Sequence, residues 1–201
     1  MAGPESEDMS LSSYLNETIA LIEKTAQLID DDEMNVVVRV VVDALAAGKP
    51  LLVCGNGGSA ADAMHITGEL VGRFLIERRA LKAICLADNP SVLTAWSNDY
   101  SYETVFARQV EAYGEPGAVL LGISTSGNSA NVVAAFETAR QIGVRTVALT
   151  GEGGGRLAAV ADHLLAVPSR NTPLIQQLHI CLYHYLCMAI ERAVIEPAAG
   201  R

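Results

Sequence analysis

Basic residues are scarce in this sequence. Lys and Arg number 14 against 23 Asp and Glu, which gives a formal net charge of −9. A protein that binds the nucleic-acid backbone needs clustered cations to neutralise phosphates, whereas the cations here are spread along the chain. We therefore expect no nucleic-acid partner, and a phosphorylated ligand must be held by local hydrogen-bond donors.

Cysteine is also sparse. Cys54, Cys85, Cys181 and Cys187 have neither the paired spacing of a zinc ribbon nor the density of a disulfide-rich secreted protein, so we expect reduced and mostly buried thiols. Residues 1–10 are acidic and polar, unlike a signal peptide. No apolar stretch approaches the roughly 20 residues that span a bilayer. These absences predict a cytoplasmic protein without membrane contact.

Charged residues make up only 18% of the 201 residues, and half of the residues are hydrophobic. This length suits one compact domain, and no repeat or linker divides the chain, so we expect a single domain over residues 1–201. A surface with so few charges is unusual for a small soluble monomer. We therefore expect some apolar surface to be buried between subunits.

Two amphipathic helices are expected first, over residues 10–29 and 33–47. The β-branched run 36–42 also fits a strand, but the Gly48-Lys49-Pro50 turn after it favours a buried helix. Short apolar runs then alternate with helical segments, which predicts a five-stranded parallel sheet whose strands are covered on both faces by crossover helices. The expected strands are 51–54, 83–87, 119–123, 146–149 and 164–167, and the expected helices are 60–73, 92–96, 104–113, 130–142, 156–161 and a long closing helix over 172–195.

Two of the strand-to-helix turns are rich in small polar residues, residues 55–59 and 124–129. Ligands of parallel sheets bind at the carboxyl ends of the strands, where helix N-termini present free N–H groups and partial positive charge. Hydroxyls in the second turn add donors for a phosphate without any lysine. Neither turn matches a P-loop or a dinucleotide motif, and each alone also fits an ordinary capped turn. As a pair they predict a phosphate site.

Two polar pairs lie on mostly apolar helices. His65 and Glu69 are four residues apart, which places them on one helix face. Gln176 and His184 are two such steps apart on the closing helix. A pair of this kind is often an ordinary surface pair. On an apolar helix, however, polar side chains favour a function such as metal binding or proton transfer.

Two further histidines and one polar run have expected positions of their own. His163 and His179 are expected to be structural or exposed. His179 is five residues from His184, so it points away from the helix face that Gln176 and His184 share. The run Asn98-Asp99-Tyr100 follows an expected helix and can bring an amide and a carboxylate to the same edge of the sheet.

The chain resembles the sugar isomerase (SIS) domain family, and in particular the phosphoheptose isomerases. The resemblance implies a flavodoxin-like α/β fold, a three-layer sandwich of parallel sheet and helices. It also implies a homotetramer with active sites shared between subunits, in which residues 1–47 pack in the oligomer and 48–201 form the core and closing helix. The matching motifs cover essentially the whole chain, at residues 54–59, 62–65, 69–70, 98–100, 121–131, 149–151, 153–154, 175–176, 179–180 and 184.

The resemblance further implies isomerisation of sedoheptulose 7-phosphate to D-glycero-D-manno-heptose 7-phosphate, towards the heptose of bacterial surface glycans. It implies one zinc ion per subunit, with His65, Glu69, Gln176 and His184 as ligands. The phosphate would be held by Ser59 and the hydroxyls of the second turn. The implied substrate contacts are Asn56, Gly57, Gly58, Ser59, Asp62, Glu69, Arg73, Asn98, Asp99, Ser124, Thr125, Ser126, Ser129 and Gln176.

The reaction moves a proton from C1 to C2 through an enediol, so a base must remove a C–H proton while an acid protonates the carbonyl oxygen. Our hypothesis is that Glu69 is the base and His184 the acid. Metal binding would lower the basicity of Glu69, so its role as base, ligand or both stays open. Two departures from the family bear on substrate preference: Gln177, expected off the site face, stands where relatives usually have Glu, and Asn171 where they often have Asp.

Two alternatives remain at this stage. The same fold serves non-catalytic proteins that associate with a replication initiator or sense sugar phosphates, and those binders lack the acid/base pair. The presence of His65, Glu69, Gln176 and His184 favours an enzyme. An isomerase for another sugar phosphate is the second alternative, because carbon count depends on pocket depth and on residues of neighbouring subunits.

Overall fold

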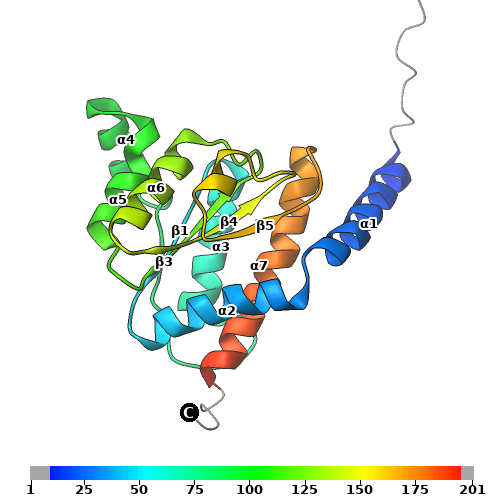
Figure 1. The fold of residues 1–201 in the computed structure, drawn as a ribbon, viewed down its shortest axis with the longest axis horizontal. Coiled ribbons are helices and arrows are strands. Elements are labelled where there is room, and N and C mark those ends of the chain that lie inside the picture. The colour runs from blue at the N-terminus through cyan, green and yellow to red at the C-terminus, as the bar shows by residue number, and fades with distance from the viewer. Residues whose placement is uncertain (1–9, 196–201) are drawn as a thin grey trace, which may run out of the picture.

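The computed structural model describes residues 10–195 (Figure 1). Two helices come first, and five strands then alternate with helices up to the long closing helix. The elements in chain order are α1 (Leu11–Leu28), α2 (Asp31–Ala46), β1 (Leu51–Gly55), α3 (Gly58–Val71), β2 (Ala83–Cys85), α4 (Pro90–Asp99), η1 (Tyr102–Thr104), α5 (Val105–Tyr113), β3 (Val119–Ser124), α6 (Ala130–Gln141), β4 (Arg145–Thr150), η2 (Gly155–Ala159), β5 (His163–Ala166) and α7 (Thr172–Ile195).

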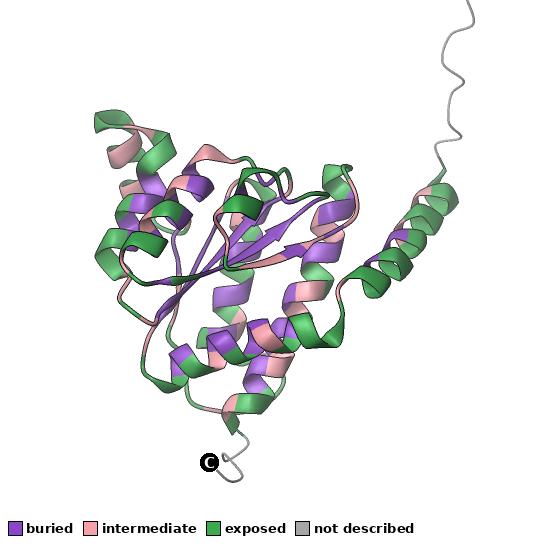
Figure 2. Ribbon diagram, in the orientation of Figure 1, coloured by how far each residue is buried: buried purple, intermediate pink, exposed green. Residues whose placement is uncertain are grey.

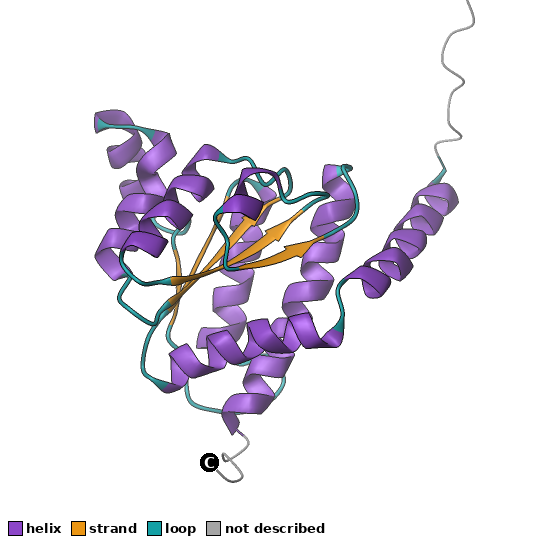
Figure 3. Cartoon of the chain, viewed as in Figure 1, coloured by secondary structure: helices purple, strands orange, loops and turns teal. Residues whose placement is uncertain are grey.

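The strands form one sheet in the order β2-β1-β3-β4-β5, and every neighbouring pair is parallel (Figure 3). The predicted five-stranded parallel sheet is thus confirmed. Chain order reverses between β1 and β3, which lie side by side with Val53 opposite Leu121. Such a switch point is where parallel sheets bind ligands, because the turns after the two central strands open at the same edge.

The central strands are buried on both faces because their side chains alternate between two apolar clusters (Figure 2). Leu51 and Val53 pack with α2, α3 and α7 on one face of the sheet. Leu52 and Cys54 pack with α5 and α6 on the other. The sandwich therefore has three layers, and the face that carries α3 and α7 is the one that positions the candidate site.

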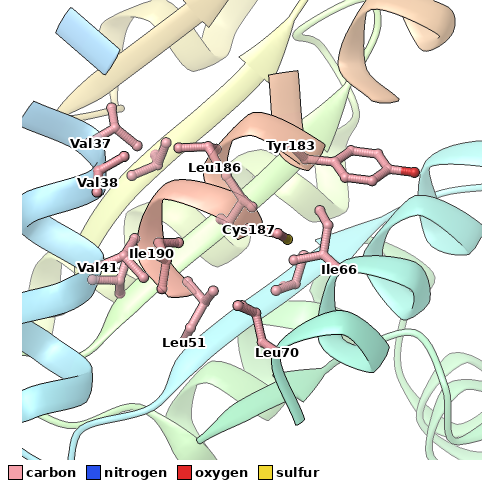
Figure 4. Packing of buried hydrophobic residues seen from close by; sticks show 14 of the residues in the cluster. Val37, Val38, Val41, Leu51, Ile66, Leu70, Tyr183, Leu186, Cys187 and Ile190 are labelled. Atoms are coloured by element: carbon pink, nitrogen blue, oxygen red, sulfur yellow. The ribbon is translucent and has the colours of Figure 1, made fainter. Parts of the chain in front are cut away.

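Helix α2 settles the ambiguity of the β-branched run. Asp30 caps it by accepting a hydrogen bond from the Glu33 backbone N–H at 2.8 Å, and acidic residues occupy its first turn, where the helix dipole favours them. Val37, Val38 and Val41 are buried against α7 and the sheet (Figure 4). Burial of this stripe outweighs the weak helix propensity of valine.

Three predictions about local structure were wrong in part. The edge strands β2 and β5 are only partly buried, because each has a neighbour on one side alone. The segment expected as a helix over 156–161 is a short 3-10 helix, η2. Helix α7 has the length and hydropathy of a membrane span, with a mean of 1.3 over its most apolar window, contrary to the expectation that no stretch approaches one. Yet Leu186 and Ile190 pack in the hydrophobic core of the domain.

Helix α1 stands apart from the sheet (Figure 1). Its main polar link to the rest is Gln177, which donates to the Tyr14 hydroxyl at 2.7 Å and accepts from the Thr18 hydroxyl at 3.2 Å. Most of its apolar side chains are exposed, with Leu11 at 73% and Ile19 at 53%. The four cysteines are all free thiols, as expected, and only Cys181 is exposed.

Candidate active site

The candidate site lies where α3 and α7 run side by side in the same direction. Gln176, near the start of α7, contacts the start of α3 so closely that a Cβ at Gly58 would overlap its amide. About two turns further on, the His184 ring lies 5.1 Å from the His65 ring, measured between centroids. The closing helix therefore faces the helix of His65 and Glu69 within one chain.

His65 is the centre of this group. Its Nε2 atom lies 3.0 Å from Glu69 Oε1, so the predicted sharing of one helix face is confirmed. Its Nδ1 atom lies 2.9 Å from the Tyr183 hydroxyl. The His184 ring stands nearly perpendicular to the rings of both His65 and Tyr183. His65 and Glu69 remain open to solvent, at 45% and 24% of their side-chain surface, so a ligand can reach them.

Tyr183 joins this exposed group to a buried carboxylate. The tyrosine is 1% exposed, and its ring crosses from α7 towards α3 with the hydroxyl beyond the apolar side chains (Figure 4). The hydroxyl donates to Asp62 Oδ1 across 3.4 Å. Burial raises the pKa of Asp62, and the Tyr183 hydrogen bond and nearby His65 only partly offset this. Asp62 Oδ2 is buried and has no hydrogen-bond partner among the described residues.

The donor set suits a zinc ion in part. Two ligands of a tetrahedral zinc lie about 3.4 Å apart, and the 3.0 Å between His65 Nε2 and Glu69 Oε1 is close to that spacing. The second nitrogen of a zinc-bound histidine usually bonds a polar group, here Tyr183. Within residues 10–195, no three His, Cys, Asp or Glu side chains already form a ligand cluster. The pair fits zinc, and His184 is the neighbouring nitrogen donor.

The turn after β3 gathers the predicted hydroxyls. Ser124 Oγ and Ser129 Oγ lie 2.9 Å apart, so Ser129 does not cap α6 with its side chain. The free N–H groups at the start of α6 are therefore available to an anion. Gly127, at φ +65°, lets the turn approach Gly154, where a Cβ would collide with the Gly154 carbonyl. This close packing holds the hydroxyl-lined turn in place.

Asn56 and Asn131 tie the two polar turns together. Their side-chain amides donate to each other at 2.8 and 2.9 Å, and the Tyr102 hydroxyl also donates to Asn56 Oδ1 at 2.7 Å. The sequence predicted Asn56 as a substrate contact. In the structure, both its amide nitrogen and its amide oxygen form hydrogen bonds to other side chains of the protein. The adjacent predicted residues Gly57, Gly58 and Ser59 form the start of α3, with Ser59 buried and the two glycines exposed.

The other predicted contacts lie further out. Asn98 and Asp99 end α4, where Asn98 donates to Asp99 at 2.9 Å and both are exposed. Arg73 follows α3 and pairs with Glu77 at 3.8 Å, with both side chains mostly exposed. Within residues 10–195, the side-chain hydrogen bond of Asn98 and the ion pair of Arg73 reach neither His65 nor the hydroxyl-lined turn.

The segment after α3 is clamped to α7 by Glu191, a residue that sequence reasoning missed. Its carboxylate is 1% exposed and accepts from the backbone N–H groups of Phe74, Leu75 and Ile76 at 2.7–2.9 Å. Arg78 pairs with it at 3.2 Å. Burial alone would raise the pKa of Glu191, but these donors outweigh it and hold the pKa below the usual value. The clamp places the Phe74 ring 5.6 Å from the His184 ring.

Two side predictions about α7 are confirmed. His179 is fully buried, and its Nε2 lies 3.0 Å from the Thr150 carbonyl oxygen, so it is structural. Burial lowers the pKa of His179 to about 4, although the Thr150 contact opposes this. Gln177 points to α1, away from the site, as expected from its position.

Comparison with known proteins places these features in a wider context. The SIS domain family matches residues 13–151. The phosphoheptose isomerase of Akkermansia muciniphila is 53% identical over 158 residues, 79% of this chain and 84% of that protein. A solved phosphoheptose isomerase from Neisseria gonorrhoeae superposes with a TM-score of 0.85 at 39% identity, covering 90% of this chain and 97% of the other. One from Francisella tularensis gives a TM-score of 0.87 at 36% identity over 90% and 96%.

Proposed function

This chain belongs to the SIS domain family, and from that premise we infer that it is a phosphoheptose isomerase. The enzyme converts sedoheptulose 7-phosphate to D-glycero-D-manno-heptose 7-phosphate. Identity above 50% to a curated phosphoheptose isomerase over four fifths of its length supports this reaction. A non-catalytic binder of the same fold is not favoured, because the acid/base candidates are present and adjacent.

One observation carries the proposal. The rings of His65 and His184 are 5.1 Å apart, and Glu69 contacts His65 at 3.0 Å. Two proton-transfer groups on different helices thus meet on the face of the sheet that carries α3 and α7. We propose that a ketose phosphate held with its phosphate on the hydroxyl-lined turn after β3 presents its reacting carbons to these groups.

We assign the proton transfers to the chain's own residues. Glu69, partly exposed, removes the C1 proton of the ketose while His184 donates a proton to the carbonyl oxygen at C2, which gives the enediol. The protonated Glu69 then gives a proton to C2, and the neutral His184 takes the O1 hydroxyl proton, which leaves the aldehyde at C1. The Phe74 ring lies beside His184, with 5.6 Å between the ring centroids. Ser124, Thr125, Ser126 and Ser129 hold the phosphate together with the N-terminus of α6, and Ser59 contributes from α3.

We propose that the site binds one zinc ion per subunit through His65, Glu69, Gln176 and His184. When bound, zinc would polarise the carbonyl and stabilise negative charge on the oxygens of the enediolate. Gln176 belongs to α7, and its amide contacts Gly58 at the start of α3; it would supply an amide oxygen to the ligand set. If Glu69 is a ligand, the charge of the metal lowers the basicity of its carboxylate.

We further propose a homotetramer whose active sites are shared between subunits. Exposed apolar side chains surround the candidate site, including Met64 at 45%, Val71 at 48% and Leu75 at 62%. An apolar groove between α1, α2 and α7 is lined by residues such as Ile22, Leu178 and Tyr185. A second copy would bury these surfaces, which a lone protomer leaves in water. Sedimentation at several protein concentrations tests the assembly.

The sequence features support a cytoplasmic enzyme that supplies heptose phosphate to surface-glycan synthesis, and we propose that setting. Substrate and product are phosphorylated sugars of the cell interior, and the negative charge of the chain leaves recognition to local donors. Fractionation of cells followed by immunoblotting tests the location. Loss of heptose from surface glycans after gene deletion tests the pathway.

The decisive measurement is turnover of sedoheptulose 7-phosphate by purified protein. Replacing Glu69 with Gln should lower kcat by about 10²–10⁴-fold, because a general base contributes that much. Glu137→Gln, at an exposed position on α6, is the matched control and should behave like the wild type. Near-normal turnover by folded Glu69→Gln protein would eliminate Glu69 as the base, and no turnover by the wild type would leave a sugar-phosphate binder.

Removal of metal with a chelator tests the zinc proposal separately from the isomerase assignment. Activity should fall after treatment with a strong chelator and return on addition of zinc. Unchanged activity in protein shown to be free of metal would reject the zinc proposal while leaving the isomerase assignment intact.

A further inference from the structure

Tyr183 has two polar neighbours and only one proton to give. Its hydroxyl oxygen lies 2.9 Å from His65 Nδ1 and 3.4 Å from Asp62 Oδ1. A carboxylate oxygen only accepts hydrogen bonds, whereas an imidazole nitrogen either donates or accepts, according to its tautomer. The direction of the tyrosine proton therefore decides which nitrogen of His65 carries hydrogen.

A neutral His65 allows two arrangements, and they differ at both Glu69 and Asp62. In the first, Tyr183 donates to Asp62 and accepts from a protonated His65 Nδ1. In the second, Tyr183 donates to Nδ1 and His65 donates through Nε2 to Glu69. The second leaves Asp62 without a donor among the described residues, since its Oδ2 atom already has no partner.

Burial decides between them. Asp62 is 8% exposed and Tyr183 1% exposed, so water cannot replace the hydrogen bond that the second arrangement removes. At the other end, His65 and Glu69 keep 45% and 24% of their side-chain surface in solvent, where water can solvate an unpaired nitrogen or carboxylate. Losing the hydrogen bond between Tyr183 and Asp62 therefore costs more free energy than losing the one between His65 and Glu69.

We propose that Tyr183 is a positioning residue which, with Asp62, keeps the proton of His65 on Nδ1 and turns the Nε2 lone pair towards Glu69. Nε2 and Glu69 Oε1 are then two electron-pair donors 3.0 Å apart. Two facing lone pairs repel unless a cation lies between them. We call the chain of contacts Asp62–Tyr183–His65 the relay. Its buried end, at Asp62, thus leaves Nε2 at the exposed end free to bind a divalent cation such as zinc, as hydrogen-bond partners of metal-bound histidines do elsewhere.

This inference rests on the proposed function only in naming His65 and Glu69 as ligands, and the tautomer can be measured without metal or substrate. The chain has four histidines, so nitrogen-15 labelling of histidine gives a spectrum that single His→Gln variants can assign. In metal-free wild-type protein, we expect His65 Nδ1 to show the chemical shift of a protonated nitrogen. A shift typical of an unprotonated Nδ1 would overturn the proposal.

Tyr183→Phe tests the consequence. This variant keeps the ring that packs in the core and removes only the hydroxyl. It should release the preference for Nδ1 protonation and weaken zinc binding by about 10–100-fold in a chelator competition assay. Tyr113→Phe, exposed on α5 and outside the relay, is the matched control and should keep the wild-type tautomer and affinity.

The outcomes separate this inference from the function. If wild-type protein binds no zinc, the ligand assignment fails, and the tautomer measurement still decides the relay. If Tyr183→Phe keeps both the wild-type tautomer and the wild-type zinc affinity, the relay is wrong and the isomerase assignment is untouched.

Discussion

The side-chain amides of Asn56 and Asn131 form a reciprocal pair, in which each donates to the other at 2.8 and 2.9 Å. The two residues are 75 positions apart in sequence; Asn56 follows β1, and Asn131 lies in the first turn of α6, directly after the hydroxyl-lined turn. The pair therefore links the turn that starts α3 to the start of α6, beside the hydroxyls that we propose to bind phosphate.

Removing the Asn56–Asn131 pair should weaken substrate binding more than it destabilises the fold. In Asn131→Ala, the half-buried Asn56 amide loses both hydrogen bonds to Asn131 and keeps only the one from Tyr102, so we expect a loss of about 1–3 kcal/mol in the free energy of unfolding and a several-fold rise in KM. Denaturant titration and steady-state kinetics measure the two effects. Asn35→Ala, exposed on α2, is the control and should change neither. An unchanged KM in Asn131→Ala would contradict a role for the pair in holding the turns.

Gly58 tests the contact between α3 and Gln176. A Cβ at this position would overlap the Gln176 amide, which is the mobile end of a long side chain and can move aside. We therefore expect Gly58→Ala to fold with near-normal stability but to lose at least tenfold in activity. Gly68→Ala, in the same helix and with open space around its Cβ, should remain active. Equal activity of the two variants would show that Gln176 is not needed where it stands.

Glu191 should prove essential to the segment after α3. In Glu191→Gln the carboxylate that pairs with Arg78 is lost and the buried guanidinium is left without a counter-charge, so the free energy of unfolding should fall by about 3–5 kcal/mol. Glu77→Gln breaks the exposed pair with Arg73 and should have no measurable effect. Equal stability of the two variants in urea would refute the buried clamp.

His179 should make the fold sensitive to mild acid. Its pKa is lowered from 6.5 to about 4, so the unfolded chain binds a proton more readily than the folded one between these values. The stability is complete above pH 6.5 and declines as the pH falls towards 4, by about 3 kcal/mol in total. His179→Gln should remove this part of the decline, whereas His163→Gln on β5 should retain it. Parallel pH profiles for the wild type and His179→Gln would disprove the assignment.

Much of the fold follows from local sequence. The continuous apolar runs of β1, β3 and β4 predicted buried parallel strands, because only a strand covered on both faces needs no polar side. The spacing of His65 and Glu69 predicted one shared helix face, since four residues make about one helical turn. The polar turns at 55–59 and 124–129 were recognisable because small residues and hydroxyls follow an apolar strand. Both edge strands were also predicted, but their partial burial and the 3-10 form of residues 155–159 were not, because neighbouring elements rather than local residues set burial and length.

By itself, then, the sequence determined which residues can do chemistry and which helix or turn carries them, because periodicity and residue type act over a few positions. Only the tertiary structure decided which of them meet. That Tyr183 reaches Asp62 and His65, that Asn131 pairs with Asn56, and that Glu191 clamps the segment at Phe74 depends on helix and strand packing between residues far apart in the chain. No local pattern encodes such contacts, since a buried tyrosine or glutamate on an apolar helix has the same sequence signature whichever partner the fold supplies.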